Sequence, residues 1–189
     1  MKDIAYNFSL MSMAYIVTYS LTFGFVFPLQ KILLSDVSTQ IGLLFLPHGV
    51  RVMTLYFYGW RGMLYLLPAS YLMLFLSIES TGLNIFAPIV SLVCCYAGIQ
   101  GARLLFSETI SVTFNIRDWK LLLWGGVIAS IFNGLGLLLL NRIVVDEISA
   151  LVFPLTDLLG YIIGDVLGLV LCLGFLMYFF RIVRHLKLT

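Results

Sequence analysis

The chain has 189 residues, of which 61% are hydrophobic and 11% are charged, and its formal net charge is +2. Soluble domains are closer to half apolar and a quarter charged, so this composition excludes a soluble globule, a nucleic-acid-binding domain and a disordered regulator. An apolar surplus of this size needs a bilayer as its solvent, and it predicts an all-α, polytopic transmembrane helical bundle that forms one integral membrane domain over residues 1–189.

Six apolar runs have roughly the length of a membrane span. In chain order they cover residues 8–29, 41–60, 63–78, 85–106, 121–140 and 154–182. Pro28 is expected to close the first run, and the longest polar stretch, residues 107–120, separates the fourth run from the fifth. A short interfacial piece is expected over residues 148–153, before the sixth run.

The second run is interrupted by Pro47, His48 and Gly49. Proline removes a backbone donor and clashes with the preceding turn, and glycine adds conformational freedom. We therefore expect a span broken at Pro47–Gly49, with a short segment over residues 41–46 and a helix over residues 48–58. Residues 59–62, with the sequence Gly-Trp-Arg-Gly, predict a tight turn at the membrane surface.

Lysine and arginine are unevenly distributed between the two sides that six spans define. An even number of spans places both termini on one side, and eight of the eleven basic residues fall on that side. Lys31 and Arg142 fall on the other side, and Arg51 lies within a span. Because cytoplasmic loops are enriched in lysine and arginine, we expect both termini of this multi-pass protein to be cytoplasmic.

Small residues recur at every fourth position in the last two runs. They are Gly126, Ser130 and Gly134 in the fifth run, and Gly160, Gly164 and Gly168 in the sixth. Small residues let helix backbones approach closely in lipid, so these stripes predict tightly packed helices. The pattern leaves open whether the stripes pack within the chain or form an interface with another membrane protein or a second copy.

Five polar or charged residues within the predicted spans are candidates for a ligand site or a charge pair. They are His48, Arg51, Asn133, Asp157 and Asp165. A charge at the bilayer centre costs about 2.5–3.5 kcal/mol on insertion scales, so Arg51 is expected to pair with Asp165 or Asp157. His48 and Arg51 are three residues apart and therefore share a helix face.

Each of these residues also has a structural interpretation. Arg51 can hold the break in the second run, or it can bind an anion. Asp157 follows Pro154 closely and can act as a favourable charge at a helix start. His48 alone is expected to be a hydrogen-bonded core residue rather than a metal ligand, and Asp165 is as consistent with a structural role as with a functional one.

No signature of an enzyme is present in the sequence. HExxH, GxSxG and P-loop motifs are missing, and no His, Asp and Glu residues cluster at metal-ligand spacing. Cys94, Cys95 and Cys172 lie inside apolar runs without a CxxC spacing, which indicates small core residues. We therefore expect no catalytic residue, no cofactor and no metal site.

Residues 45–51 (FLPHGVR) and 58–61 (YGWR) form one notable pattern, and residues 164–168 (GDVLG) form another. The first resembles the early "F-x-P-x-G … G-x-R" pattern of bacterial membrane-associated sensor (MASE-type) domains, and the second resembles their late "G-D-x-x-G" element. The two segments cover about a tenth of the chain. The matching positions are Pro47, Gly49, Gly164, Asp165 and Gly168. The resemblance implies a multi-span sensory module in the inner membrane of a bacterium.

Such domains are usually fused to a histidine kinase or a cyclic-dinucleotide output domain. None follows the last predicted span, so we expect any signal to pass to a separate partner. The sequence thus favours a non-enzymatic accessory, assembly or ligand-sensing subunit of a larger membrane complex, surrounded by membrane lipid and taking a small ligand where it senses one.

Two alternatives belong to other functional classes. A substrate-binding component of a small-molecule transporter fits the six short spans, and the broken second span and intramembrane charges suit a midplane site. An enzyme that acts on a lipid-linked substrate is the least favoured interpretation, because no catalytic constellation is visible.

Overall fold

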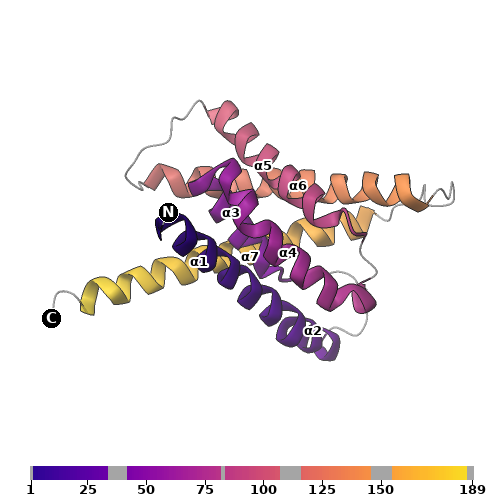
Figure 1. Ribbon diagram of the computed structural model, residues 1–189, viewed down its shortest axis with the longest axis horizontal. Coiled ribbons are helices and arrows are strands. Elements are labelled where there is room, and N and C mark those ends of the chain that lie inside the picture. The colour runs from indigo at the N-terminus through magenta and orange to yellow at the C-terminus, as the bar shows by residue number, and fades with distance from the viewer. Residues whose placement is uncertain (1, 34–41, 82–83, 107–115, 146–154, 187–189) are drawn as a thin grey trace.

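The computed structural model describes residues 2–33, 42–81, 84–106, 116–145 and 155–186 (Figure 1). Within these ranges the chain is helical apart from short connections, and it contains no strand. The helices are α1 (Lys2–Leu21), η1 (Thr22–Val26), α2 (Phe27–Leu33), α3 (Leu46–Tyr58), α4 (Trp60–Thr81), α5 (Ala87–Phe106), α6 (Ile116–Val145) and α7 (Leu155–Leu186).

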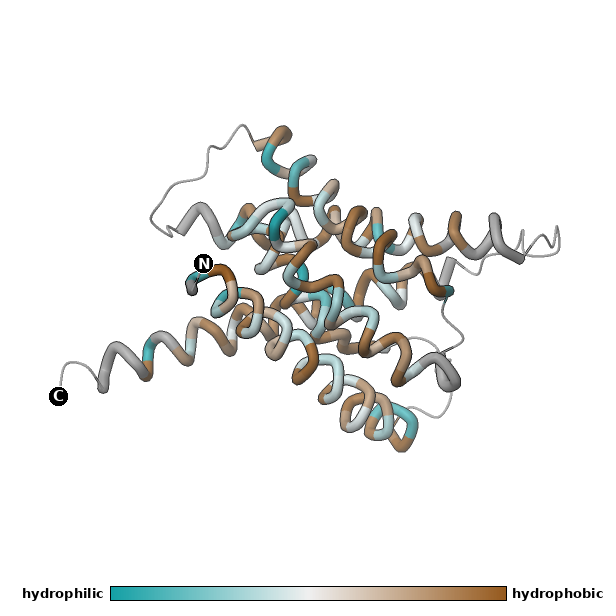
Figure 2. Tube along the Cα trace, in the orientation of Figure 1, coloured by the Kyte–Doolittle hydropathy of each residue, from teal (hydrophilic) through white to brown (hydrophobic). Residues whose placement is uncertain are grey.

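Four helical segments are long and apolar enough to cross a membrane. They are Asp3–Leu33, Ala87–Phe106, Trp119–Leu137 and Leu158–Phe179. Figure 2 shows hydrophobic residues along the length of these helices, and many large apolar side chains, among them Leu104, Leu76 and Phe175, lie exposed on the outside of the structure. The all-helical class and the presence of candidate transmembrane helices are therefore as predicted.

The first helical segment does not end at Pro28 as expected. It continues through η1 and α2 to Leu33. In η1 the chain widens to a π-helical turn, and the N–H of Phe27 bonds to the carbonyl oxygen of Thr22, five residues earlier. A proline ring clashes with the carbonyl of an ordinary helical turn, and a π-helical turn just before it accommodates the ring without ending the helix.

The interruption of the second run lies slightly earlier than the sequence indicated. Residues 42–45 are non-helical, and α3 begins at Leu46 with Pro47 in its first turn. Proline fits this position because the first N–H groups of a helix have no intrahelical partner. At the other end of α3, Gly59 adopts a positive φ of 58° and turns the chain directly into α4. The turn expected over residues 59–62 is therefore confined to Gly59, and residues 60–62 already belong to α4.

The last two long helices extend beyond the predicted runs. α6 begins at Ile116, so residues 116–120 of the polar stretch are helical, and α7 ends at Leu186. Residues 107–115 and the interfacial piece expected over residues 148–153 lie outside the described residues.

α3 lies at the centre of the bundle, and nine of its thirteen residues are buried. α1 packs along α4, α5 packs along α6, and α7 contacts both α3 and α6 (Figure 1). α3 contributes Val52 and Leu55 to a core shared with α5, α6 and α7, and Val50 to a second core shared with α1, α4 and α5. The short α3 therefore connects the two halves of the structure.

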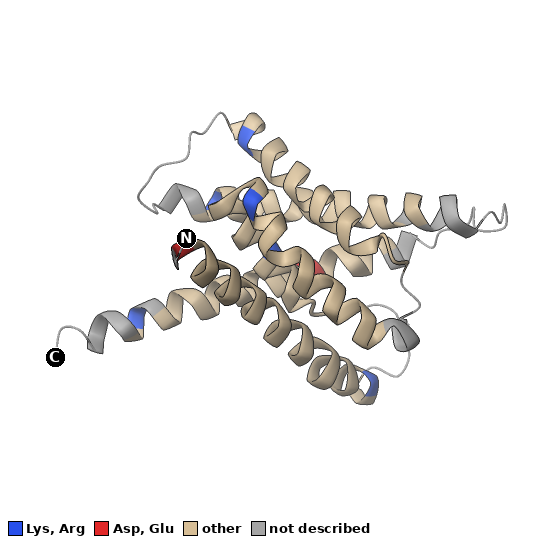
Figure 3. Ribbon diagram, in the orientation of Figure 1, with Lys and Arg blue, Asp and Glu red and all other residues tan. Residues whose placement is uncertain are grey.

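The two termini of the chain lie toward the same end of the bundle (Figure 1). Most of the lysine and arginine residues in the described ranges lie toward that same end (Figure 3). The asymmetry of basic residues that the sequence contains is therefore also an asymmetry in space.

Candidate functional site

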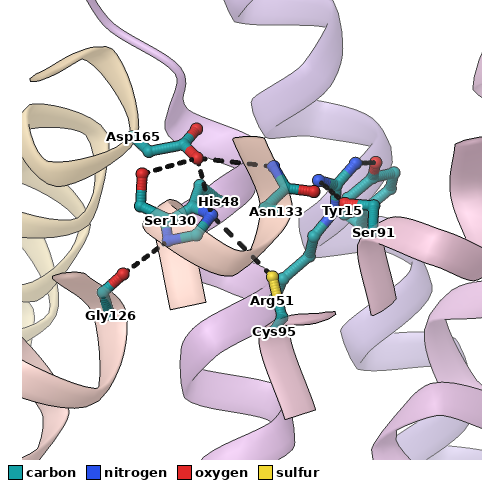
Figure 4. Close-up of polar contacts among 9 residues, drawn as sticks. All are labelled: Tyr15, His48, Arg51, Ser91, Cys95, Gly126, Ser130, Asn133 and Asp165. Atoms are coloured by element: carbon teal, nitrogen blue, oxygen red, sulfur yellow. Dashed lines mark hydrogen bonds and ion pairs between the residues drawn. The ribbon is translucent and has the colours of Figure 1, made fainter. Parts of the chain in front are cut away.

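A buried polar cluster lies where α1, α3, α5, α6 and α7 meet (Figure 4). Its members are Tyr15, His48, Arg51, Ser91, Cys95, Gly126, Ser130, Asn133 and Asp165. His48 is completely buried, and the exposed fractions of Arg51 and Asp165 are 7% and 4%. Three of the five candidate residues from the sequence are thus central to one site, and Asn133 is a fourth member.

Close contact between α7 and the chain before α3 places His48 beside α7. The N–H of Phe45 donates a 3.0 Å hydrogen bond to the carbonyl oxygen of Gly164. A Cβ on Gly164 would overlap the carbonyl oxygen of Gly42, and a Cβ on Gly168 would overlap that of Phe45. These glycines of α7 are therefore required by the non-helical segment, residues 42–45, that lies on them.

Gly49 continues this contact into α3. A Cβ on Gly49 would stand 2.7 Å from the Cβ of Cys172 and 3.1 Å from the carbonyl oxygen of Gly168. The start of α3 therefore lies directly against α7, which brings His48 and Asp165 into register.

Three of the remaining small residues of the stripes, Gly126, Ser130 and Gly134, also pack against other helices of the same chain. Gly126 faces the side chain of Leu169, and a Cβ on Gly134 would stand 2.7 Å from Cδ1 of Leu158. Ser130 hydrogen-bonds to Asp165, and Gly160 lies half-buried in α7. Of the two interpretations of the stripes, packing within the chain is the one seen at these positions.

His48 bridges three helices through its two ring nitrogens. Nδ1 lies 3.3 Å from Oδ2 of Asp165 on α7, and Nε2 lies 3.2 Å from the carbonyl oxygen of Gly126 on α6. The thiol of Cys95 on α5 lies 4.0 Å from Nδ1. This geometry matches the expectation of a hydrogen-bonded core histidine, and it adds a carboxylate partner that the sequence did not indicate.

Oδ2 of Asp165 is the focus of several contacts. Besides His48, the hydroxyl of Ser130 donates to it at 3.1 Å and the amide of Asn133 donates to it at 3.5 Å. The amide oxygen of Asn133 is buried and has no hydrogen-bond partner in the described part of the chain. The carboxylate is therefore held by neutral donors from α6 on one side and by an imidazole from α3 on the other.

The expected direct ion pair between Arg51 and Asp165 is wrong. Nη1 of Arg51 donates to the hydroxyl of Ser91, and Nη2 donates to the hydroxyl of Tyr15, each at 2.6 Å. The guanidinium also lies 5.3 Å and 5.6 Å from the ring centres of Tyr15 and Phe45. Figure 4 shows the reason: Arg51 points toward α1 and α5, away from Asp165.

The other pairing proposed for Arg51 involves Asp157, whose side chain lies outside the described part of the structure. Nε of Arg51 is buried and makes no hydrogen bond to any described residue. The positive charge of Arg51 is thus held by two hydroxyl groups and two aromatic faces, which satisfy its hydrogen bonding only in part.

Sequence reasoning missed Tyr15, Ser91 and Cys95. Tyr15 resembles an ordinary aromatic residue in an apolar helix, and Cys95 resembles a small core residue. The only available signal was Ser91, an isolated hydroxyl in an apolar run. All three cysteines are free thiols.

The cluster combines one fixed cation, one carboxylate and one imidazole with neutral hydroxyl and amide groups. Within the described ranges, no set of three His, Cys, Asp or Glu side chains converges in a way that could hold a metal ion. Groups of the kinds present can hold a proton or hydrogen-bond to a polar ligand. In comparison with known proteins, no family model, no curated protein and no solved structure matches this chain.

Proposed function

We propose that this chain is a six-span protein of a bacterial inner membrane that serves as a non-enzymatic accessory or ligand-sensing module of a larger membrane complex. The observation that carries the proposal is the buried polar cluster, in which five helices meet around His48, Arg51 and Asp165. The contacts of His48 tie α3 to α5, α6 and α7, and those of Arg51 tie α3 to α1 and α5, so a change in either set alters how the helices pack against one another. A partner that contacts the outer faces can read that change.

The length of α3 and the segment before it supports a fifth span. The thirteen residues of α3 rise about 20 Å, and residues 42–45 continue for about one helical turn of α7, from Gly168 to Gly164, or about 6 Å, so that together they approach the roughly 30 Å hydrocarbon core. Non-helical backbone is tolerated at that depth only where protein satisfies its polar groups. Leu43 and Phe45 meet this requirement, since their N–H groups donate to Gln30 Oε1 and to the carbonyl oxygen of Gly164.

α4 supports the sixth span, because its 22 residues correspond to about 33 Å of helix. With six spans, the end of the bundle that holds both termini and most basic residues would face the cytoplasm.

The resemblance to membrane-associated sensor domains gains support from the contacts between its two segments. The early segment provides Gly49 and His48, and the late one provides Gly168 and Asp165. Gly49 packs against Gly168, and His48 contacts Asp165, although more than a hundred residues separate the segments. A pair of patterns that form one contact is expected if they specify a common structural element.

Site-specific photo-crosslinking in native membranes tests the proposed partner. The crosslinking residue is introduced singly at the exposed positions Met13, Leu76, Leu104 and Phe175, with the fully buried Leu66 as the control position. We expect at least one exposed position to form an adduct of defined mass with one membrane protein, and Leu66 to form none. Adducts with lipid alone at all four positions would contradict an accessory role.

The substrate-binding component of a transporter is the second candidate, and two buried atoms favour it. Nε of Arg51 is a donor and Oδ1 of Asn133 is an acceptor, and neither has a hydrogen-bond partner among the described residues. A polar small molecule in the cluster would satisfy both. Native mass spectrometry of protein purified in mild detergent should then show a retained ligand that Asn133→Leu releases, whereas a mass equal to the bare chain would contradict this candidate.

A further inference from the structure

We propose that His48 and Asp165 form a proton-binding site, in which one exchangeable proton lies between Nδ1 of His48 and Oδ2 of Asp165. The inference deepens the proposed function by naming the proton as a ligand of the polar cluster, and it rests on that function for the location of the cluster within the membrane. Binding involves no redox change and no covalent bond between heavy atoms: the proton is taken up from water and is returned to water on release.

The first step concerns the other ring nitrogen of His48. Nε2 lies 3.2 Å from the carbonyl oxygen of Gly126. A carbonyl oxygen can only accept a hydrogen bond, so Nε2 must carry a hydrogen atom. This contact assigns the Nε2–H tautomer to the neutral ring and leaves the lone pair of Nδ1 directed away from α6.

The second step concerns Nδ1, which faces Oδ2 of Asp165 at 3.3 Å. With hydrogen on Nε2 only, two acceptors face each other at this distance, and their contact is repulsive. A proton on Nδ1 converts the contact into a charge-assisted hydrogen bond from the imidazolium to the carboxylate. The geometry of the pair is therefore that of a site occupied by one proton.

The third step concerns the charges around the pair. Arg51 on α3 is a fixed cation, and Cys95 on α5 places a neutral thiol 4.0 Å from Nδ1. Tyr15 on α1 reaches the site only through Arg51. Among its described residues, α6 contributes only neutral groups to the site: the carbonyl of Gly126 and the side chains of Ser130 and Asn133.

The proton-free state and the proton-bound state of the site each carry one unfavourable feature. Without the proton, Arg51 and Asp165 balance in charge, but two acceptors are left in contact. With the proton, the hydrogen bonds are complete, but a net positive charge is buried in the protein. Because each state carries one unfavourable feature, the proton is exchangeable rather than permanently held.

Occupancy of the site changes the link between α3 and α7. The proton joins His48 to Asp165, and its release restores the repulsion between them. The hydroxyl of Ser130 on α6 donates to the carboxylate of Asp165 in both states. The position of α3 against α7 thus responds to proton binding, which gives the proposed module a chemical signal to detect.

The chain offers a direct test because it has only two histidines, His48 and His185. A His185→Gln variant carries one imidazole, and its ring nitrogens can be labelled with ¹⁵N and observed by NMR in the full-length protein in lipid nanodiscs. Across the pH range over which the protein stays folded, we expect one transition as the pH rises, from a ring with hydrogen on both nitrogens to the Nε2–H tautomer. A ring whose protonation does not change, or one with hydrogen on Nδ1 only, would overturn the proposal.

Two variants in this background separate the site from its structural surroundings. Asp165→Asn places an amide where the carboxylate was, and its N–H can donate permanently to Nδ1, so we expect the transition to be lost. Ser130→Ala removes a neighbouring hydrogen bond and leaves the pair, so the transition should remain. A transition in Asp165→Asn equal to that of the parent would overturn the proposal.

The titration of the parent protein decides the question even if Asp165→Asn does not fold. Photo-crosslinking to a partner is measured independently of the ring nitrogens. The proposed function can therefore fail while the proton site stands, and a failed titration would leave the partner result intact.

Discussion

The carbonyl oxygen of Phe45 occupies the space that a Cβ on Gly168 would need. One turn earlier on α7, the carbonyl oxygen of Gly42 stands in the same relation to Gly164, and the N–H of Phe45 bonds to the carbonyl of Gly164. The obstacles are backbone atoms, which cannot rotate aside as a side chain can. The two glycines thus allow a non-helical segment to lie directly on a helix, and this contact sets the position of α3.

Gly168→Ala is expected to destabilise the protein by about 1–3 kcal/mol, the usual cost of overpacking a filled interior. The measurement is the thermal unfolding midpoint of the purified protein in a mild detergent, which should fall. Gly174→Ala is the matched control, because Gly174 lies on the same helix and a Cβ there meets nothing within 4 Å. Equal midpoints for the two variants would show that residues 42–45 do not lie against α7 as described.

Removing the carboxylate of Asp165 should be among the most damaging single changes. Asp165→Leu leaves His48, Ser130 and Asn133 without their shared partner, and breaking a buried pair in this way costs about 3–5 kcal/mol. Chemical unfolding followed by tryptophan fluorescence measures the loss. Asp3→Leu, at an exposed position in the first turn of α1, serves as the control and should unfold like the parent protein.

Arg51→Lys tests whether the fork of the guanidinium matters in addition to its charge. A lysine ammonium is a compact point charge and cannot reproduce the paired bonds to Ser91 and Tyr15, so we expect a loss of about 1–3 kcal/mol. In a double-mutant cycle with Tyr15→Phe, the combined loss should be smaller than the sum of the two single losses, because both changes remove the same bond.

Arg61→Lys is the control for that cycle, since Arg61 is exposed and lies over the ring of Trp60. Its stability should stay close to that of the parent. Strict additivity between Arg51→Lys and Tyr15→Phe would contradict the hydrogen bond between these two side chains.

The helical class and the approximate position of each helix could be read from the sequence, because long apolar runs report burial or lipid contact directly. The continuation through Pro28 could not, since it depends on a π-helical turn that has no signature in residue type. The segment 42–45 was equally hidden: its residues are as apolar as those of a helix, and only contact with Gly164 and Gly168 explains its non-helical form.

The sequence identified the important residues of the polar cluster but not their partners. The spacing of His48 and Arg51 shows that they share a face of α3, and it does not show which neighbour each one meets. Charge alone suggested that Arg51 pairs with Asp165, whereas packing places the imidazole of His48 beside the carboxylate and directs Arg51 to two hydroxyl groups. Partner choice depends on how five helices are arranged, and no local pattern encodes that arrangement.

The proposed six-span topology makes a prediction about Lys31 and Arg61, which lie on either side of residues 42–58. Single cysteines at these two positions, in a variant lacking Cys94, Cys95 and Cys172, can be labelled in intact cells whose outer membrane has been permeabilised, using a thiol reagent that does not cross the inner membrane. Lys31→Cys should react in these cells, and Arg61→Cys should react only in inverted inner-membrane vesicles, because basic residues concentrate on the cytoplasmic side. A cysteine at the buried Leu66 should remain unlabelled in both preparations. Reaction of both test positions from the same face would mean that residues 42–58 do not cross the bilayer, and the orientation of every later helix would then be reversed.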